Sequence, residues 1–253
     1  MSVLRYPGGK SRAIKTLEGY IPEDAKVIIS PFTGGGSFEI HLRNKGKVVL
    51  CNDKFEPLWN FWFCLLNDKI ELVRQVNLLT PCTKEMWSEM RRNIMLPTIP
   101  CYQRAAYYFV INRCSFSGST LSGGFSAESA EKRFTRSSID RLLAFNAADI
   151  DIQNMDCIDF IELNEEYDYM YLDPPYYLPT GNKLYGRDGD MHENFDHDAL
   201  YTQLTTRENW VMSYNDCEWV REKYKDYTIV PAAWSYGMNK TKKSSEVIIT
   251  SIR

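Results

Sequence analysis

A carboxylate followed by two prolines and two tyrosines stands in the stretch MYLDPPYY, residues 170–177, after an apolar run that is typical of a strand. Proline lacks an amide hydrogen and has a fixed φ, so a sheet cannot continue through Pro174 and Pro175. The residue before a proline is held extended, which keeps Asp173 at the carboxyl end of the strand. The sequence therefore predicts an acid held rigidly at a strand end, with aromatic rings directly after it.

This arrangement suits methyl transfer to an exocyclic amine of a nucleobase. The lone pair of such an amine is delocalised into the ring, which makes the nitrogen a poor nucleophile. Two fixed acceptors, the carboxylate of Asp173 and the carbonyl of Pro174, would engage the amine protons and turn the lone pair toward a methyl donor. An aromatic ring would hold the base plane, because base–aromatic stacking contributes about 1–3 kcal/mol. The alternative is a turn that ends a strand and contains an incidental acid.

A glycine-rich turn, PFTGGGS at residues 31–37, follows one predicted strand and precedes a short predicted helix, 38–46. Glycines let the backbone approach a ligand closely, and the N-terminus of a helix can receive a polar group. The next predicted strand, 47–53, ends in Asp53, where an acid can accept hydrogen bonds from ribose hydroxyls. The pair indicates a nucleoside-like cofactor, and its spacing alone leaves NAD and S-adenosylmethionine open. The Asp-Pro-Pro-Tyr turn favours S-adenosylmethionine.

These candidate residues require a sheet that brings several strand ends together. The β-loop-α-β unit at residues 25–53 is typical of the start of a doubly wound α/β sheet. We expect this α/β domain to be interrupted at about 55–148 by a helical insertion that carries a Ser/Gly-rich loop, 112–126. Further strands are predicted at 149–156, 168–173, 208–216, 226–233 and 244–252, and further helices at 11–20, 137–148 and 157–163.

The composition is that of an ordinary globular protein, since 44% of the 253 residues are hydrophobic and 25% are charged. No apolar run is long enough to span a membrane and the N-terminus has no signal-peptide pattern, so we expect a cytoplasmic protein. Seven cysteines without a CxxC pair favour reduced thiols over a disulfide framework or a structural zinc site. With only three histidines as well, no metal is expected.

Positive charge is concentrated in the predicted insertion. Residues 84–141 contain nine lysines and arginines against five aspartates and glutamates, a net charge of +4 in a chain whose total is −3. A basic segment within an acidic chain is typical of a surface that faces phosphates. The alternative is a solvated helical face, and charge alone does not separate the two.

Six motifs, in their order along the chain, resemble the Dam-type (D12 class) DNA adenine-N6 methyltransferases. The resemblance implies S-adenosylmethionine as the methyl donor, without a metal. It also implies a Rossmann-like catalytic domain formed by residues 1–54 and 149–253, with a target-recognition domain at 55–148. The motifs are YPGGK (6–10), PFTGGGS (31–37), ND (52–53), NRCSFSG (112–118), DPPY (173–176) and SYND (213–216).

The resemblance also assigns roles to individual residues. Three residues would hold a flipped adenine: Asp173, Pro174 and Tyr176. The cofactor would contact Tyr6, Lys10, Gly34, Gly36, Asp53, Asp156, Phe160 and Asp173, with Phe160 packing on its adenine ring. The DNA would contact Arg113, Phe116, Ser117, Arg133 and Arg136. Phe116 matches an aromatic residue that is wedged into the duplex, and its alternative role is to anchor a loop to the helical core.

Two positions depart from the family pattern. Ser30 stands before Pro-Phe, where members of the family usually have an aspartate or glutamate. Leu121 stands near the place of an arginine that reads guanine in GATC-methylating members, and an apolar side chain cannot make that bidentate contact. We therefore do not expect GATC as the target, and Ser30 leaves two alternatives open: weaker cofactor binding, or compensation by another residue.

Taken together, the motifs predict site-specific transfer of a methyl group from S-adenosylmethionine to the N6 amine of a flipped adenine in double-stranded DNA, without a covalent enzyme intermediate. The alternatives are a methyltransferase that acts on cytosine N4, on RNA or on an amide nitrogen, and a catalytically idle DNA-binding homologue. The resemblance is compatible with a companion restriction endonuclease, with a monomer or weak dimer, and with a prokaryotic, viral or phage origin.

Overall fold

A computed structural model of the chain describes residues 2–146, 148–167, 169–177, 195–232 and 246–251. Residues 178–194 and 233–245, which include parts of the predicted strands 226–233 and 244–252, lie outside the described residues. Within the described residues, no helix is both long and apolar enough to cross a membrane. All seven cysteines are free thiols.

A seven-stranded, mostly parallel sheet forms the centre of the fold, in the order β3-β2-β1-β4-β5-β7-β6. The strand β7 is antiparallel to both of its neighbours, and the other pairings are parallel. The chain builds the sheet outward from β1 through β2 to β3, and then returns to the other side of β1 for β4. Ligands of doubly wound sheets bind at such a reversal, outside the carboxyl ends of the strands. The strands are β1 (Val27–Ser30), β2 (Val48–Asn52), β3 (Ile150–Gln153), β4 (Tyr169–Leu172), β5 (Trp210–Asn215), β6 (Thr228–Pro231) and β7 (Glu246–Thr250).

Helices cover both faces of the sheet, which explains why its central strands are apolar without alternation. Adjacent residues of β1 point to opposite faces, so Ile28 packs with Phe38 of α2, whereas Ile29 packs with Phe160 of α9. This is a mixed α/β fold of the kind expected for a Rossmann-like methyltransferase. The elements beside the sheet are η1 (Lys10–Arg12), α1 (Ile14–Glu18), α2 (Ser37–Asn44), α9 (Cys157–Leu163), α11 (His197–Thr205) and α12 (Glu218–Lys223).

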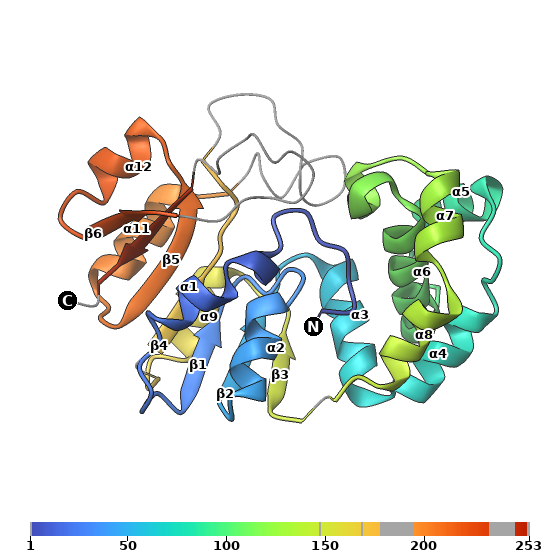
Figure 1. The fold of residues 1–253 in the computed structure, drawn as a ribbon, viewed down its shortest axis with the longest axis horizontal. Coiled ribbons are helices and arrows are strands. Elements are labelled where there is room, and N and C mark those ends of the chain that lie inside the picture. Colours follow the sequence, from blue (N-terminus) through green and yellow to red (C-terminus); the bar gives the residue numbers. More distant parts are fainter. Residues whose placement is uncertain (1, 147, 168, 178–194, 233–245, 252–253) are drawn as a thin grey trace.

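A group of helices between β2 and β3 lies at the end of the molecule opposite β5–β7 (Figure 1). Its central helix is α6, which is buried on most sides and stacks Phe109 on Phe61 with ring centroids 6.0 Å apart. The indole of Trp59 donates to the carbonyl of Ile152 in β3, which ties these helices to the sheet. The elements are α3 (Glu56–Asn67), α4 (Lys69–Asn77), α5 (Lys84–Asn93), α6 (Cys101–Cys114), η2 (Phe116–Gly118), η3 (Thr120–Ser122), α7 (Ala127–Arg133) and α8 (Arg136–Leu143).

The N-terminal segment, residues 2–12, joins the two parts of the fold. The buried Asn112 side chain of α6 accepts from the backbone N–H of Arg5 at 3.0 Å and donates to the carbonyl of Arg5 at 2.6 Å. Gly118, with φ +74°, lies so close to Arg5 that a Cβ there would stand 2.7 Å from its backbone oxygen. The same segment then runs to the carboxyl edge of the sheet, where Tyr6 and Lys10 lie.

Candidate active site

A cavity of about 520 Å³ opens at the carboxyl ends of β1, β2 and β4. Its volume is within the range of small-molecule sites, about 300–1,000 Å³. The walls come from the N-terminal segment, the glycine-rich turn, the first turns of α2 and α9, and the segment after β4. Most of the residues that the sequence predicts for a cofactor line this cavity: Tyr6, Lys10, Gly34, Gly36, Asp53, Asp156 and Asp173.

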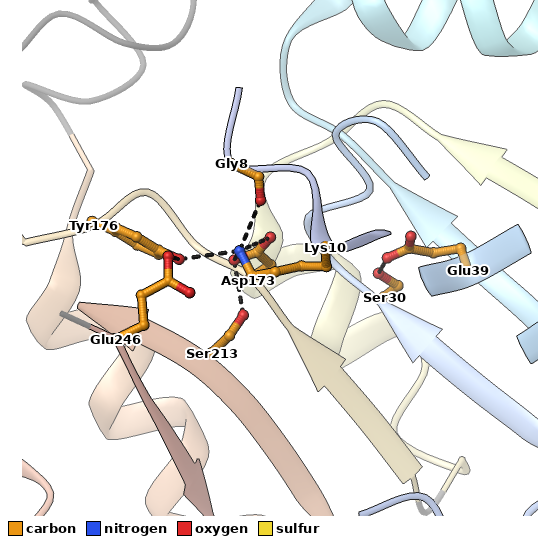
Figure 2. A network of polar contacts seen from close by, with 8 residues as sticks. All are labelled: Gly8, Lys10, Ser30, Glu39, Asp173, Tyr176, Ser213 and Glu246. Atoms are coloured by element: carbon orange, nitrogen blue, oxygen red, sulfur yellow. Dashed lines mark hydrogen bonds and ion pairs between the residues drawn. The ribbon is translucent and has the colours of Figure 1, made fainter. Parts of the chain in front are cut away.

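Asp173 follows β4 directly and points toward Lys10 (Figure 2). The ammonium Nζ of Lys10 lies 2.7 Å from Oδ1 and 2.8 Å from Oδ2 of the carboxylate, and the hydroxyl of Ser213 in β5 donates to Oδ1 at 2.9 Å. The Lys10 side chain is 4% exposed, whereas the Asp173 side chain is 23% exposed. Of the two, only the carboxylate has an accessible side. This open side faces the cavity, which Pro174 and Pro175 also line.

Tyr176 extends the same polar network. Lys10 donates to the carbonyl of Gly8 at 3.1 Å and to the hydroxyl of Tyr176 at 3.1 Å, and that hydroxyl donates to the carboxylate of Glu246 in β7 (Figure 2). The ammonium also lies 5.4 Å from the centroid of the tyrosine ring. Lys10, Asp173, Tyr176 and Glu246 thus hold one another in place beside the cavity that Lys10 and Asp173 line.

The second tyrosine of the motif has a different position. The ring of Tyr177 stacks on Trp219 of α12, with centroids 4.5 Å apart and planes 5° from parallel. Its backbone carbonyl accepts from the side chain of Asn215 at 2.7 Å. These contacts fix the backbone just beyond Tyr176. Tyr176 therefore belongs to the polar network of Lys10, whereas Tyr177 anchors the segment to α12 and β5.

Asp53 closes the glycine-rich turn from the end of β2. Its two carboxylate oxygens accept from the backbone N–H groups of Gly34, at 2.9 Å, and Phe55, at 3.0 Å. Burial raises the pKa of Asp53 to about 6, although these two hydrogen bonds act in the opposite direction. Gly34 has φ +50°, and a Cβ there would stand 2.9 Å from the ring of Tyr6, so both backbone and packing require glycine. The carboxylate is placed where a polar ligand group could approach it.

Asp156 and Phe160 lie on the same short helix, α9, but only the first reaches the cavity. Asp156 caps the helix by accepting from the N–H of Ile158 at 3.0 Å, and it pairs with Lys54 at 2.8 Å. Phe160 is fully buried between α9 and the sheet and does not line the cavity. The predicted packing of Phe160 on a cofactor ring does not fit this position. Ile158 lines the cavity instead and is the better placed apolar contact.

Ser30, at the end of β1, is buried and donates to the carboxylate of Glu39 at 2.8 Å (Figure 2). Glu39 belongs to the first turn of α2, is 3% exposed, and lines the cavity. Burial raises the pKa of this carboxyl to about 7. The sequence analysis missed Glu39, although one acid between the apolar Phe38 and Ile40 on a short helix was an available signal.

The loop after α6 presents the residues predicted to meet DNA. Phe116 is 66% exposed, which separates it from the core, and Ser117 beside it has φ +53°. Hydrogen bonds from the side chain of Asn112 fix the loop. It donates to the carbonyl of Gly118 at 3.2 Å and to the hydroxyl of Thr120 at 3.1 Å. Leu121, by contrast, is 1% exposed and belongs to the core, so it anchors the loop.

The three arginines predicted to contact DNA occupy different environments. Arg133 at the end of α7 and Arg136 at the start of α8 are exposed, and Arg136 pairs with Asp140 at 2.9 Å. Arg113 is 5% exposed and donates to the carbonyl of Val3, and burial together with nearby arginines lowers its pKa to about 10. A DNA contact by Arg113 does not fit this position, because its guanidinium is enclosed under the N-terminal segment.

Comparisons with known proteins relate the whole arrangement to one class of enzyme. Residues 6–238 match the model of the family described as D12 class N6 adenine-specific DNA methyltransferase. The chain is 23% identical over 235 residues to the type II methyltransferase M.CviBI of Paramecium bursaria Chlorella virus NC1A, an alignment that covers 89% of this chain and 86% of the relative. It is 28% identical over 184 residues to a DNA N-6-adenine-methyltransferase of Escherichia phage P1, covering 69% of this chain but only 24% of that longer protein.

Proposed function

The chain belongs to the D12 class of N6 adenine-specific DNA methyltransferases, and we propose that its methyl transfer takes place at the carboxylate of Asp173 on an adenine turned out of double-stranded DNA. The enzyme transfers a methyl group from S-adenosylmethionine to adenine in DNA. The observation that supports the location is the cavity itself, since one continuous space joins the glycine-rich turn to Asp173.

The cavity fits S-adenosylmethionine in size and in the chemistry of its walls. The carboxylate of Asp53 at the end of β2 would accept hydrogen bonds from the ribose hydroxyls, and Ile158 would pack on the adenine ring of the cofactor. When bound, the cofactor supplies an electrophilic methyl group on a sulfonium sulfur. Tyr6 and the glycine-rich turn would enclose it from the opposite side.

Asp173 would act on the amine of the target base. Its carboxylate and the carbonyl of Pro174 accept hydrogen bonds from the two N6 protons, which directs the nitrogen lone pair toward the methyl donor. As the new N–C bond forms, the bond from the methyl carbon to the sulfonium sulfur would break, leaving S-adenosylhomocysteine. Positive charge would grow on N6 beside the carboxylate until one N6 proton passes to solvent. Tyr176 would hold the base plane at its ring, and Lys10 keeps the carboxylate oriented before the base arrives.

Recognition of the duplex is assigned to the helical insertion, residues 55–148. The exposed ring of Phe116 would enter the base stack, at the cost of a few kcal/mol of unstacking, and stabilise the gap left by the adenine. Arg133 and Arg136 would neutralise backbone phosphates. Leu121 is buried in the core, which supports a target other than GATC.

The decisive experiment is transfer of a labelled methyl group from S-adenosylmethionine to duplex DNA, followed by separation of the nucleosides. Label in N6-methyladenine is the expected result. Label in 4-methylcytosine, in RNA only, or in neither nucleic acid would contradict the proposed function and favour the cytosine, RNA or idle alternatives. Sequencing the methylated DNA of cells that express the chain would then identify the target site.

A companion restriction endonuclease is part of the same proposal, because one relative is named a type II methyltransferase. The expected partner is an endonuclease that cuts the same unmodified sequence. Once the methylated site is known, DNA modified by this chain should resist an endonuclease of that specificity, whereas unmodified DNA should be cut. Equal cutting of both substrates would argue against a protective role.

A further inference from the structure

We propose that Glu39 and Ser30 together form the subsite for the α-ammonium group of the methyl donor, with the helix residue Glu39 supplying the carboxylate that the strand end lacks. This inference rests on the proposed function and adds a residue that no sequence motif assigned. It also gives a role to the buried hydroxyl of Ser30, which donates to Glu39 at the end of β1.

The first support is the position of the carboxylate. Glu39 is 3% exposed, yet it lines the cavity, so its carboxylate is buried beside the space that a ligand would occupy. Its one hydrogen bond from another side chain comes from Ser30, at 2.8 Å. Among the described residues no lysine, arginine or histidine forms an ion pair with it. A buried carboxylate is costly unless a cation or several donors compensate it, so this site calls for a cationic ligand group.

The second support is the order of acids along the sheet edge. Asp53 follows β2, Ser30 ends β1 and holds Glu39 of α2, and Asp173 follows β4. These three strands are neighbours in the order β2-β1-β4. A donor whose ribose lies at Asp53 and whose methyl group lies near Asp173 must pass over the end of β1. The part of the donor next to its sulfur is the aminocarboxypropyl chain, and the positively charged group of that chain is its ammonium. Glu39 therefore meets a charge of the right sign at the right place.

The third support comes from the groups around Glu39. Lys10 of η1 and Asp173 after β4 act on it electrostatically, and it acts in turn on the Cys51 thiol of β2. Its own backbone N–H and the hydroxyl of Ser30 in β1 donate to it. Lys10 is paired with Asp173, and the two charges act on Glu39 in opposite directions, with the effect of Asp173 the larger. Burial outweighs the remaining contributions and brings the pKa to about 7. A bound ammonium would favour the ionised form, so below pH 7 binding should release a proton from this carboxyl.

The test compares two uncharged-sulfur probes by calorimetry at pH 7.5. S-adenosylhomocysteine carries the ammonium, whereas 5′-methylthioadenosine has the same nucleoside and sulfur without the aminocarboxypropyl chain. Glu39→Gln should weaken binding of the first probe about 10- to 100-fold, the effect of a charge-assisted hydrogen bond, and change binding of the second less than about threefold. As the matched control, Asp53→Asn should weaken both probes alike, because both contain the ribose.

Rescue and pH dependence sharpen the result. Ser30→Asp combined with Glu39→Gln returns a carboxylate to the strand end and should recover most of the lost affinity for S-adenosylhomocysteine. In the unmodified enzyme, affinity for this probe should rise between pH 6 and 7.5 and fall above about pH 8, where an α-amino group loses its proton. Glu39→Gln should remove the rise on the acid side and keep the fall.

Stability distinguishes a binding role from a structural one. The folded-state pKa of Glu39 is raised above its unfolded value, so the ligand-free protein loses stability as pH rises from about 4.5 to 7. Glu39→Gln removes that loss and should unfold at an equal or higher temperature at pH 8. Equal weakening of both probes, lower thermal stability, or no change in either affinity would overturn the proposal. Failure of the unmodified enzyme to bind S-adenosylhomocysteine would instead contradict the proposed function.

Discussion

The ammonium of Lys10 contacts both carboxylate oxygens of Asp173, at 2.7 and 2.8 Å, although 163 residues separate them in the chain. The pair joins the N-terminal segment to the strand end that carries the Asp-Pro-Pro-Tyr motif. It also means that the carboxylate we propose as the acceptor for the base amine already holds a cation before any base arrives. An incoming amine must therefore share or replace the contact with Lys10, and the ion pair sets the starting geometry of the reaction.

We expect this ion pair to contribute to stability as a coupled unit. Lys10→Met and Asp173→Asn should each lower the free energy of unfolding by about 1–3 kcal/mol, because each leaves a largely enclosed partner without its counter-charge. Asp173 is partly open to solvent, which keeps the expected cost below that of a fully buried pair. The double variant should lose less than the sum of the two, as measured by urea unfolding. If the two losses of unfolding free energy were strictly additive, the contact would contribute no coupling energy.

Asp173→Ala should abolish turnover while leaving the methyl donor bound. The variant removes the negative charge beside the reacting nitrogen, and loss of one such preorganised group typically lowers kcat by at least about 100-fold. Affinity for S-adenosylhomocysteine should change less than about threefold, because Asp53 and Ile158 remain in the cavity. Single-turnover kinetics and calorimetry measure the two effects separately. Retained turnover would contradict the role assigned to the carboxylate.

Phe116→Ala should weaken the capture of a flipped base without affecting the fold. The ring is 66% exposed, so its removal should change the free energy of unfolding by less than about 0.5 kcal/mol. In DNA with 2-aminopurine at the target position, the fluorescence increase on binding should fall severalfold. Ile70 of α4, which is 71% exposed, provides the control, and Ile70→Ala should leave the fluorescence unchanged. Equal responses of the two variants would argue against the wedge.

We expect Arg133 to contact DNA and Arg113 to have a structural role. Arg133→Ala should reduce DNA affinity on all sequences and lower the salt slope of log K by about one unit, because one phosphate contact is lost. Arg113→Ala should leave that slope unchanged. It should lower the free energy of unfolding by about 1–3 kcal/mol, since the Val3 carbonyl loses its donor. Salt titrations and urea unfolding of both variants check the division, and the reverse pattern would contradict it.

Local residue patterns predicted the sheet well, and the reason is visible at the strand ends. Acids and prolines stop the ladder, so the predicted strand 168–173 appears as Tyr169–Leu172, directly before Asp173. The predicted helix 157–163 appears as Cys157–Leu163, capped by Asp156. Because parallel strands end at one edge, these local features were sufficient to bring Asp53 and Asp173 to one cavity.

Local patterns could not predict contacts that depend on how distant segments pack. Arg113 is enclosed because the N-terminal segment lies over α6, and nothing within its own helix indicates this. Phe160 was predictable in part, since Cys157, Phe160 and Ile161 form a buried stripe at helical spacing. The contact of Glu39 with Ser30 depends on the angle at which α2 leaves the glycine-rich turn, which a one-dimensional pattern does not contain.

One short stretch of chain connects the loop after α6, which we propose contacts DNA, with the cavity at the sheet edge. Arg5 is hydrogen-bonded to Asn112 and lies against Gly118, and Tyr6 and Lys10, which follow it, line the cavity. If the contacts of this stretch differ between the free and the DNA-bound enzyme, binding of DNA must change the affinity for the methyl donor. The methyl donor must then change the affinity for DNA by the same factor. The increase in donor affinity that DNA produces would then equal the increase in DNA affinity that the donor produces, whichever ligand arrives first.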